Sequence, residues 1–383
     1  MRKPVSDPAS RAVTRILYLT WRDLDHPEAG GAEVFAERTA SELARLGREV
    51  VMFSSTWNGA EPKVRRDGFT IVRRGGRYTV YLRALLHLLV HGRRYDAVID
   101  VQNGVPFWSP LLFRGPVINL THHVHREQWS TFFPGPVARF GWFLESCLAP
   151  RVYRRSRYVT VSESSRSELV GIGVEPERIS LVYSGIDLPE DYPSYRDVPR
   201  TVAPSLVTVC RLVPHKRIEL AIDAVAKLAP QMPGLELHVV GDGYWLDELT
   251  SHAERSGVSD RVVFHGFVDS RKKHELLASS WVMAMPSLKE GWGLTIIEAG
   301  LHGTPTVAFR DAGGTQESIH DQETGLLADD EDELLEGLNR LLADVDYREK
   351  LGDNARVNAL RYSWRTSGED FDRIVTREIS RRS

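Results

Sequence analysis

Residues Trp281–Ala299 read WVMAMPSLKEGWGLTIIEA, and this stretch contains the arrangement that decides the fold. The apolar run Trp281–Met285 predicts a buried strand, which the connector Pro286–Lys289 ends. The segment Glu290–Ala299 then predicts a helix that starts near Gly293. A strand, a loop and a helix in this order are the repeating unit of a parallel α/β sheet.

The same alternation occurs in two series along the chain, and each series predicts one parallel sheet wound by helices. The first series predicts strands at Arg15–Thr20, Glu49–Ser55, Asp96–Val101, Val117–Thr121 and Tyr158–Val161. The second series predicts strands at Leu206–Cys210, Leu235–Val240, Arg261–Phe264, Trp281–Met285 and Thr306–Phe309. Because the pattern restarts, and because 383 residues exceed one ordinary hydrophobic core, we expect two α/β domains.

The polar segment Leu188–Pro204 carries four prolines and supports neither a central strand nor a helix. We therefore expect a first domain at 1–190, a linker at 191–204, a second domain at 205–362 and a terminal helical segment at 363–383. Helical spacing of apolar residues predicts the last helices at Glu331–Ala343, Tyr347–Arg361 and Trp364–Ser380.

Charge and cysteine usage restrict the class of protein. Residues 1–190 contain 26 Lys and Arg against 20 Asp and Glu, and the remainder contains 23 against 32. The basic first half favours an anionic partner such as a membrane surface or a phosphorylated acceptor, or it reflects dispersed surface arginines. Cys147 and Cys210 form no CxxC pair, which indicates neither a disulfide framework nor a zinc site. With no signal-like or membrane-spanning run, we expect a cytoplasmic protein, soluble or peripheral, without a nucleic-acid partner.

Glycines and carboxylates surround the predicted helix start near Gly293. Gly291, Trp292, Gly293 and Leu294 leave backbone N–H groups open to a ligand at the carboxyl ends of the strands. On a continuous helix, Glu290 and Glu298 would stand about two turns apart on nearly the same face and accept hydrogen bonds from vicinal hydroxyls. The alternative is a glycine-opened helix with two solvated acids.

Two cations follow the strand predicted at Leu206–Cys210. Arg211 and Lys216 at a strand-to-helix turn suit a diphosphate, although a solvated turn explains them equally. The turn Gly241-Asp242-Gly243 ends the next strand and favours a shared crevice. It lacks the third glycine of a dinucleotide fingerprint, and the chain has no P-loop motif.

In the first half, Gly30 and Gly31 precede a predicted helix, with Val34, Phe35, Leu43 and Leu46 expected on its inner face. Paired glycines there form an anion cradle or a plain turn. The run Thr121-His122-His123-Val124-His125 ends a strand. Without a carboxylate cluster it is a weak metal signal, so a hydrogen-bonding role in a pocket is favoured over metal binding.

The ordered set of motifs resembles family-4 retaining glycosyltransferases of the GT-B fold, from about Ile16 to Phe371. The matching motifs are Gly30-Gly31-Ala32-Glu33, the Thr-x-His at His123, Val161-Ser162-Glu163-Ser164, Ser184-Gly185-Ile186-Asp187, Arg211 with Lys216, Gly241-Asp242-Gly243, Phe264-His265-Gly266 and Glu290 to Glu298. The resemblance implies two facing Rossmann-like domains with a deep interdomain cleft, an acceptor-binding first domain and a second domain that binds a nucleotide-diphosphate sugar of UDP or GDP type.

The same resemblance implies roles for single residues. The residue matching Glu290 holds the sugar hydroxyls, that matching Glu298 holds the ribose, and Arg211 and Lys216 match the diphosphate ligands. Gly30 and Gly31 would approach the donor phosphates, His123 or its neighbour His122 would bond the transferred sugar, and the helix around Trp364 would cross back onto the first domain. Gly266, Gly291, Trp292, Gly293 and Leu294 complete the expected donor site.

The resemblance further implies transfer with retention and without a metal or other cofactor, by front-face attack on the sugar. A nucleotide-sugar epimerase of the same fold and a non-catalytic sugar-nucleotide-binding protein are the alternatives. The acceptor is expected to be a hydroxyl, and our hypothesis for its carrier is a lipid-linked glycan at the inner membrane face. Arginines and aromatic side chains of the first half favour that view: Arg65, Arg66, Arg73, Arg74, Arg93, Arg94, Arg151, Arg154, Arg155 and Arg157, with Phe132, Phe133, Phe140, Trp142, Phe143 and Leu144. A buried helix would explain the same aromatic residues.

Overall fold

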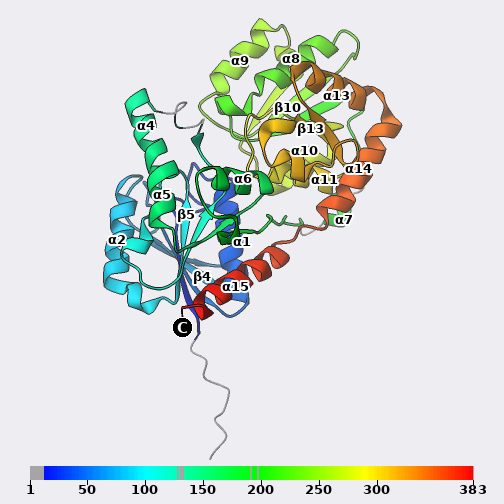
Figure 1. The fold of residues 1–383 in the computed structure, drawn as a ribbon. Coiled ribbons are helices and arrows are strands. Elements are labelled where there is room, and N and C mark those ends of the chain that lie inside the picture. Colours follow the sequence, from blue (N-terminus) through cyan, green and yellow to red (C-terminus); the bar gives the residue numbers. More distant parts are fainter. Residues whose placement is uncertain (1–12, 127–128, 130–132, 190–191, 196–197, 383) are drawn as a thin grey trace, which may run out of the picture. The chain divides into compact units, whose positions relative to one another are not determined.

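The computed structural model describes residues 13–126, 129, 133–189, 192–195 and 198–382, and their contacts divide the chain into two units (Figure 1). Unit 1 comprises the residues up to Thr160, Glu168–Val182 and those from Arg365 on. Unit 2 comprises Val161–Ser167 and Tyr183–Trp364. Each unit contains its own β-sheet with helices, which confirms the predicted α/β class with two Rossmann-like units.

The sheet of unit 1 has the strand order β3-β4-β2-β1-β5-β6-β7-β8, and every pairing is parallel except β3 with β4. Its strands are β1 (Arg15–Leu19), β2 (Glu49–Ser54), β3 (Lys63–Arg66), β4 (Phe69–Arg73), β5 (Ala97–Gln102), β6 (Val117–Thr121), β7 (Arg157–Thr160) and β8 (Ile179–Leu181). The five expected strands are present. The sequence patterns missed β3, β4 and β8, which lie toward the two edges of the sheet.

The helices of unit 1 connect these strands or cover them. They are α1 (Gly31–Arg45), α2 (Thr79–His91), α4 (Gly135–Phe143), α5 (Ala149–Val152) and α15 (Trp364–Ser380), with a π-helical turn at Leu144–Leu148 between α4 and α5. Helix α6 (Glu163–Gly171) begins among residues of unit 2 and ends among those of unit 1.

The sheet of unit 2 is fully parallel, in the order β11-β10-β9-β12-β13-β14. Its strands are β9 (Ser205–Val209), β10 (Glu236–Val240), β11 (Val262–Gly266), β12 (Val282–Met285), β13 (Thr306–Phe309) and β14 (Gly325–Ala328). Its helices are α7 (Tyr192–Tyr195), α8 (Glu219–Leu228), α9 (Leu246–Arg255), α10 (Ser270–Ser279), α11 (Leu294–Leu301), α12 (Thr315–Ser318), α13 (Glu331–Ala343) and α14 (Val345–Ala359). The short strand β14 was not predicted.

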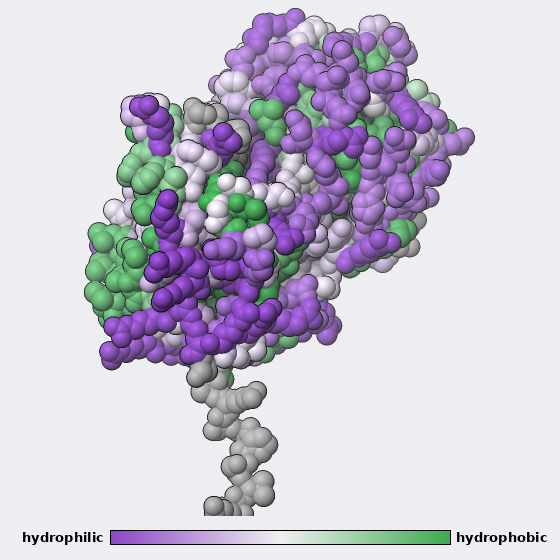
Figure 2. Space-filling view, viewed as in Figure 1, coloured by the Kyte–Doolittle hydropathy of each residue, from purple (hydrophilic) through white to green (hydrophobic). Residues whose placement is uncertain are grey.

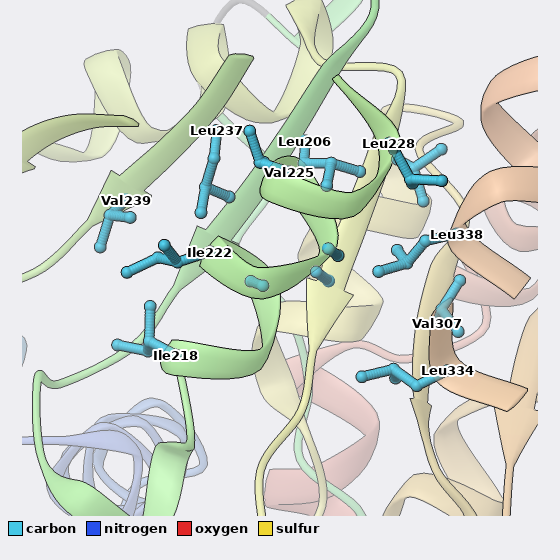
Figure 3. Packing of buried hydrophobic residues seen from close by; sticks show 14 of the residues in the cluster. Leu206, Ile218, Ile222, Val225, Leu228, Leu237, Val239, Val307, Leu334 and Leu338 are labelled. Atoms are coloured by element: carbon cyan, nitrogen blue, oxygen red, sulfur yellow. The ribbon is translucent and has the colours of Figure 1, made fainter. Parts of the chain in front are cut away.

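The core of unit 2 lies on both faces of its sheet because side chains alternate along each strand. Val282 and Ala284 join the cluster formed with α8, α9 and α13, whereas Met283 and Met285 join the cluster formed with α10 and α11. Figure 3 shows the first cluster, in which side chains of α8 lie beside those of β10 and side chains of α13 lie beside Val307. Burial on both faces makes the strands read as continuous apolar runs.

The division of the chain falls before the predicted linker. The chain enters unit 2 at Tyr183 because this segment packs there: the ring of Tyr183 lies 4.7 Å from that of Trp292. The expectation that 191–204 contains no helix is also wrong, because α7 forms within it. Tyr192 donates a hydrogen bond of 2.9 Å to the carbonyl of Leu301, and the buried Tyr195 contacts the ring of His302.

Helix α15 packs within unit 1, as the red helix of Figure 1 shows beside the blue α1. The ring of Phe371 is fully buried and lies 6.3 Å from that of Tyr18. Arg48 donates two hydrogen bonds, of 2.8 and 3.0 Å, to the carboxylate of Asp372. A Cβ at Gly368 would stand 2.2 Å from the Cβ of Glu42, so close packing on α1 requires glycine there.

Candidate functional site

The loops that follow β9, β10, β12 and β13 bring the predicted donor residues of unit 2 to the carboxyl edge of its sheet, where ligands of open α/β sheets bind. The loop after β9 carries Arg211 and, in a 3-10 turn at Pro214–Lys216, Lys216. The backbone N–H of Leu288 donates to the carbonyl of His215 at 2.9 Å, which ties this loop to the one after β12.

Lys216 and Glu290 form the central contact of this edge. The Nζ atom of Lys216 lies 2.5 Å from Oε1 of Glu290, and the two side chains are only 14% and 12% exposed. Burial excludes most of the water that would otherwise solvate the two charges, so each depends on the other. The residue predicted to bind the sugar hydroxyls and a residue predicted to bind the diphosphate therefore form one ion pair.

The backbone of Glu290 is fixed in a β-bridge with Gly313, not in a helix. Its N–H donates to the carbonyl of Ala312 at 2.7 Å, and its carbonyl accepts from Gly314 at 3.0 Å. Helix α11 begins only at Leu294, after Gly293 at φ 81°. The expectation that Glu290 and Glu298 share one helical face is wrong, because the left-handed Gly293 breaks the helix between them.

Gly313 and Gly314 hold the loop of Glu290, and the sequence analysis did not single them out. A Cβ at Gly314 would lie 2.3 Å from the carbonyl oxygen of Gly291, and one at Gly313 would lie 2.9 Å from that of Glu290. The only signal in the sequence is the Gly-Gly pair shortly after the apolar run of β13. The loop approaches this turn so closely that both positions require glycine.

Glu298 is held by a lysine that the sequence analysis also missed. Oε1 of Glu298, on α11, accepts a hydrogen bond of 2.7 Å from Nζ of Lys273, on α10. Glu298 is buried and Lys273 is partly buried. No spacing signal could identify Lys273, because it lies on a different helix from its partner.

Trp292 lies in an aromatic cluster. It is 4% exposed, and its ring lies 4.7 Å from Tyr183 and 5.2 Å from Tyr362. Its two aromatic neighbours are thus residues of unit 2. Packing against them fixes the loop that contains Gly291 and Gly293. Gly291 and Leu294 beside it are partly exposed at the start of α11.

The turn after β10 packs against the loop after β9. Gly241, at φ 129°, packs against the carbonyl of Cys210: a Cβ at this position would lie 1.9 Å from that oxygen. Gly243 packs in the same way against the carbonyl of Leu212. The two glycines therefore join neighbouring loops through close backbone contact. Asp242 is exposed at the tip of this turn, and Gly266, at φ 64°, has open space where a Cβ would stand.

The remaining groups of this edge differ in exposure and protonation. Arg211 is exposed to solvent. Burial, with a smaller contribution from the charge of Lys216, lowers the pKa of His215 to about 4, so this histidine is neutral at neutral pH. Burial raises the pKa of the Cys210 thiol to about 11, which makes it a poor nucleophile. Arg211 and Lys216 are thus two cations that this edge offers to an anionic ligand.

In unit 1, Gly30 and Gly31 open α1. The N–H of Gly30 donates to Oε2 of Glu33 at 2.7 Å, and the other oxygen of Glu33 accepts from Arg22 at 2.9 Å. A Cβ at Gly31 would meet nothing within 4 Å, so this glycine faces open space. Phe35 and Leu43 are buried as expected and Val34 is partly buried, but Leu46 is exposed because the helix ends at Arg45.

The two histidines that follow β6 differ in their exposure to solvent. His122 is buried, with its ring 5.3 Å from that of Phe35 and edge-on to it, and burial lowers its pKa to about 4. His123 is partly exposed, 4.3 Å from the ring of His125. His125 in turn bonds the buried Glu145 at 3.0 Å. His123 is thus the more accessible member of the pair.

Part of the expected basic surface is used internally. Arg73 is buried and forms a bidentate pair with Asp23, Arg66 contacts Asp25, and Arg157 pairs with Glu378 at 3.2 Å. These arginines were predicted to serve an anionic partner, but they stabilise unit 1 instead. Arg74, Arg93, Arg94, Arg151, Arg154 and Arg155 are exposed. Phe132 lies outside the described residues.

No group of three or more His, Cys, Asp and Glu side chains among the described residues is arranged to hold a metal ion. Helices that could span a bilayer are likewise absent from the part of the chain that the structure describes.

Two family models match the chain. The model described as glycosyl transferases group 1 matches residues 199–358, and that described as Glycosyltransferase Family 4 matches residues 29–190. Together they include most of both units. Among curated proteins, a GDP-mannose-dependent alpha-(1-6)-phosphatidylinositol monomannoside mannosyltransferase of Mycolicibacterium smegmatis is 28% identical over 381 residues, which covers 91% of this chain and 96% of that protein. A D-inositol 3-phosphate glycosyltransferase of Nocardia farcinica is 26% identical, with coverage of 89% and 83%.

Solved structures show the same fold. Sucrose-phosphate synthase from Thermosynechococcus elongatus has a TM-score of 0.79 at 20% identity and covers 97% of this chain and 100% of its own. Anabaena HepE in complex with UDP-glucose has a TM-score of 0.75 at 20% identity, with coverage of 94% and 99%. WaaG, a glycosyltransferase involved in lipopolysaccharide biosynthesis, has the same TM-score, identity and coverage.

Proposed function

This chain belongs to the family-4 glycosyltransferases and has the GT-B fold, and we propose that it transfers a hexose from a nucleotide-diphosphate sugar to a hydroxyl acceptor with retention and without a metal ion. The observation that carries this proposal is the Lys216–Glu290 pair at the carboxyl edge of the unit 2 sheet. A cation and a carboxylate at this edge match the two groups of such a donor, its diphosphate and its sugar hydroxyls, and so support the proposal. Catalytic roles fall to His123, Arg211, Lys216 and Glu290.

Binding of the donor would divide the ion pair between two parts of the ligand. Glu290 would accept hydrogen bonds from sugar hydroxyls, and Lys216 with the exposed Arg211 would neutralise the diphosphate. Backbone N–H groups at the start of α11, near Gly293, add fixed dipoles directed at an anion. Glu298, oriented by Lys273, would accept from the ribose hydroxyls.

The transfer step needs little from the protein beyond charge and position. The acceptor oxygen bonds to the anomeric carbon on the face that the diphosphate leaves, the carbon–oxygen bond to the diphosphate breaks, and a phosphate oxygen takes the acceptor proton. Negative charge grows on the leaving diphosphate, so Arg211 and Lys216 act most strongly in the transition state. Losing either cation would cost on the order of 3 kcal/mol of that stabilisation.

For unit 1, the family resemblance suggests further groups that would bind the donor. Gly31 faces open space, which suits a loop that approaches the donor phosphates, and Gly30 shares that role. We assign the hydrogen bond to the transferred sugar to His123 rather than His122. Burial against Phe35 keeps His122 in the core, and its lowered pKa makes it neutral.

The acceptor proposed for this reaction is a lipid-linked or membrane-proximal glycan, and the enzyme would work in the cytoplasm at the inner membrane face. The name of the mycobacterial relative contains a phosphatidylinositol mannoside, and that of WaaG refers to lipopolysaccharide biosynthesis. Their names support an envelope or glycolipid acceptor here. The donor base stays open between guanosine and uridine, because the relatives include a GDP-mannose enzyme and a protein solved with UDP-glucose.

The experiment is a thermal-shift screen of the full chain with GDP, UDP, GDP-mannose and UDP-glucose, followed by turnover with the best donor. A donor that binds only the folded state raises the melting temperature by mass action. Transfer to a hydroxyl acceptor with the anomeric configuration kept supports the proposal. An isomerised nucleotide sugar formed without acceptor identifies an epimerase instead, and a donor-dependent shift without any turnover identifies a binding protein.

A further inference from the structure

Helix α2 is apolar on two opposite faces. Val80, Ala84 and Leu88 are buried in the core of unit 1. On the other side, Leu82, Leu86, Leu89 and Val90 are 61%, 45%, 67% and 70% exposed. A surface helix normally places charged or polar residues on its outer face, so this second apolar face needs an occupant.

Helix α4 continues the apolar surface. Val137, Phe140 and Phe143 are exposed on it, while Ala138 and Gly141 are buried. Figure 2 shows hydrophobic surface over both α2 and α4, on the same edge of unit 1. The surface formed by Leu82, Leu86, Leu89, Val90, Val137, Phe140 and Phe143 is called the apolar ridge below.

Both helices of the ridge carry arginine and no acidic residue, and the exposed Asp96 follows only after the turn that contains Arg93 and Arg94. Residues 68–95 contain six arginines and neither Asp nor Glu. Arg83 is exposed on α2, and Arg93 and Arg94 are exposed in the turn that follows it. Near α4, Arg139 is exposed, whereas Glu145 is fully buried and bonded to Trp129.

We propose that the apolar ridge and its arginines dock unit 1 on an anionic lipid bilayer. An interfacial helix inserts its apolar side chains below the headgroups while cationic residues contact the anionic headgroups. Leucine and phenylalanine side chains flanked by arginine have this composition, and the terminal atoms of arginine reach the headgroups while the stem stays apolar. This proposal rests on the proposed function, in which the acceptor lies close to a membrane. It adds the surface of unit 1 that would contact that membrane.

Charge disfavours a second copy of the chain as the occupant. A two-fold contact between two ridges would bring the same arginines together without acidic partners, and protein interfaces carry few charged residues at their centres. Anionic lipid headgroups complement the same arrangement. The lipid surface is therefore the occupant that the charges favour.

The test is flotation of the full chain with vesicles, without donor or acceptor. Vesicles of phosphatidylglycerol with phosphatidylcholine are compared with phosphatidylcholine alone, at low and high salt. We expect the protein to float with the anionic vesicles at low salt only. The double variant Leu82→Ser/Leu89→Ser should weaken binding at least tenfold, and Arg93→Glu/Arg94→Glu should weaken it similarly.

A matched control tests whether the effect belongs to the ridge. Val345 and Val357 are exposed on α14 of unit 2, so Val345→Ser/Val357→Ser should bind vesicles as the wild type does. Unchanged melting temperatures show that all variants fold. The inference is overturned if the wild type does not float with anionic vesicles, or if Leu82→Ser/Leu89→Ser floats equally well. It is also overturned if light scattering shows a dimer that this variant alone loses.

The same preparations separate this inference from the proposed function. The donor-dependent thermal shift needs no lipid, and flotation needs no donor. If the protein does not bind vesicles but a nucleotide sugar still raises its melting temperature, only the ridge proposal is wrong. If the protein binds vesicles but no nucleotide sugar raises its melting temperature, the proposed donor site is wrong instead.

Discussion

The Nζ atom of Lys216 lies 2.5 Å from Oε1 of Glu290, although 74 residues separate the two in the chain. The loops after β9 and β12 meet at this pair, and the Glu290 loop rests in turn on Gly313 and Gly314. The residue expected to bind the sugar hydroxyls and the residue expected to bind the diphosphate are thus in contact with each other.

Replacement of Glu290 by alanine should abolish transfer and leave the fold intact. The backbone of residue 290 is held by Ala312 and Gly314, and these hydrogen bonds do not need the side chain. Turnover of the best donor and circular dichroism of Glu290→Ala measure the two parts of this prediction. A well-folded variant with full activity would show that the assignment of Glu290 is wrong.

Lys216→Met should lower kcat/KM by about a hundredfold or more, which corresponds to about 3 kcal/mol of lost transition-state stabilisation. It should also lower the melting temperature, because the largely buried Glu290 side chain then loses its ionic partner. In Lys216→Met/Glu290→Gln both charges are gone, so we expect a smaller loss of stability than in Lys216→Met. Equal melting temperatures for the single and double variants would contradict a coupled pair.

Lys273 should act as a positioning residue for Glu298. Its Nζ donates to Oε1 of Glu298 at 2.7 Å. In Lys273→Met the carboxylate loses that partner, so the KM for the donor should rise several-fold while kcat changes little. Lys273→Arg retains a donor and should restore most of the affinity. The neighbouring Lys272→Met is the control, because the side chain of Lys272 is exposed and pairs at 3.6 Å with Glu275 instead. A fall in kcat with unchanged KM would argue against this role.

Chelation should leave transfer unaffected. The groups proposed to balance the diphosphate charge are the side chains of Arg211 and Lys216 and the N–H groups near Gly293, and all of them belong to the protein. Initial rates with and without EDTA, after dialysis, test this expectation. Activity that disappears in EDTA and returns with magnesium or manganese would refute it.

Mild acid should destabilise the fold. Burial lowers the pKa of His122 to about 4, and the pKa values of His274 and His302 are lowered for the same reason. Below about pH 6.5 the unfolded chain binds protons that these buried rings do not, so the free energy of unfolding falls until the pH reaches the folded-state pKa. A histidine like His122 would cost about 2 kcal/mol at pH 5. Burial raises the pKa of Glu37 to about 7 and also that of Asp100, and these two groups act in the opposite direction.

Urea unfolding at pH 7.5 and 5.0 measures this balance. His122→Phe keeps an aromatic ring beside Phe35 and removes the titrating group, so its stability should depend less on pH than that of the wild type. Because more histidines than acids have strongly shifted pKa values, the wild type should be less stable at pH 5.0. Equal or greater stability at pH 5.0 would rule this explanation out.

Buried strands were predictable because their residues are apolar on both faces of a parallel sheet. Of the strands at the edges of the two sheets, β3, β8 and β14 were missed, together with β4 beside β3, whereas the edge strand β11 was recognised. Strand β3, Lys63–Arg66, has a charged sequence, as edge strands often do, and its burial never exceeds an intermediate level. Strand β14 has only four residues, Gly325–Ala328, and its sequence GLLA contains no β-branched or aromatic residue. Short or charged strands carry too little periodicity for recognition.

The motifs of the site were visible in the sequence, but their geometry was not. The helix start near Gly293 was predicted, yet the left-handed backbone that separates Glu290 from α11 depends on the contact with Gly313 and Gly314. Lys273 carries no motif, and it becomes significant only because α10 and α11 pack together. Partners on different elements are determined by tertiary packing, which spacing along the chain does not encode.

The position of α15 has a consequence for the order in which the protein is made. Arg48 and Asp372, which pair within unit 1, are 324 residues apart. At the usual rate of 5–20 residues per second, a ribosome needs roughly 15 to 65 s to synthesise the chain between them. During that time the nascent unit 1 lacks Phe371, and the rings of Tyr18 and Phe35 that it covers are without their partner. Unit 1, although it begins first, is completed last, because its core closes only when α15 packs against α1.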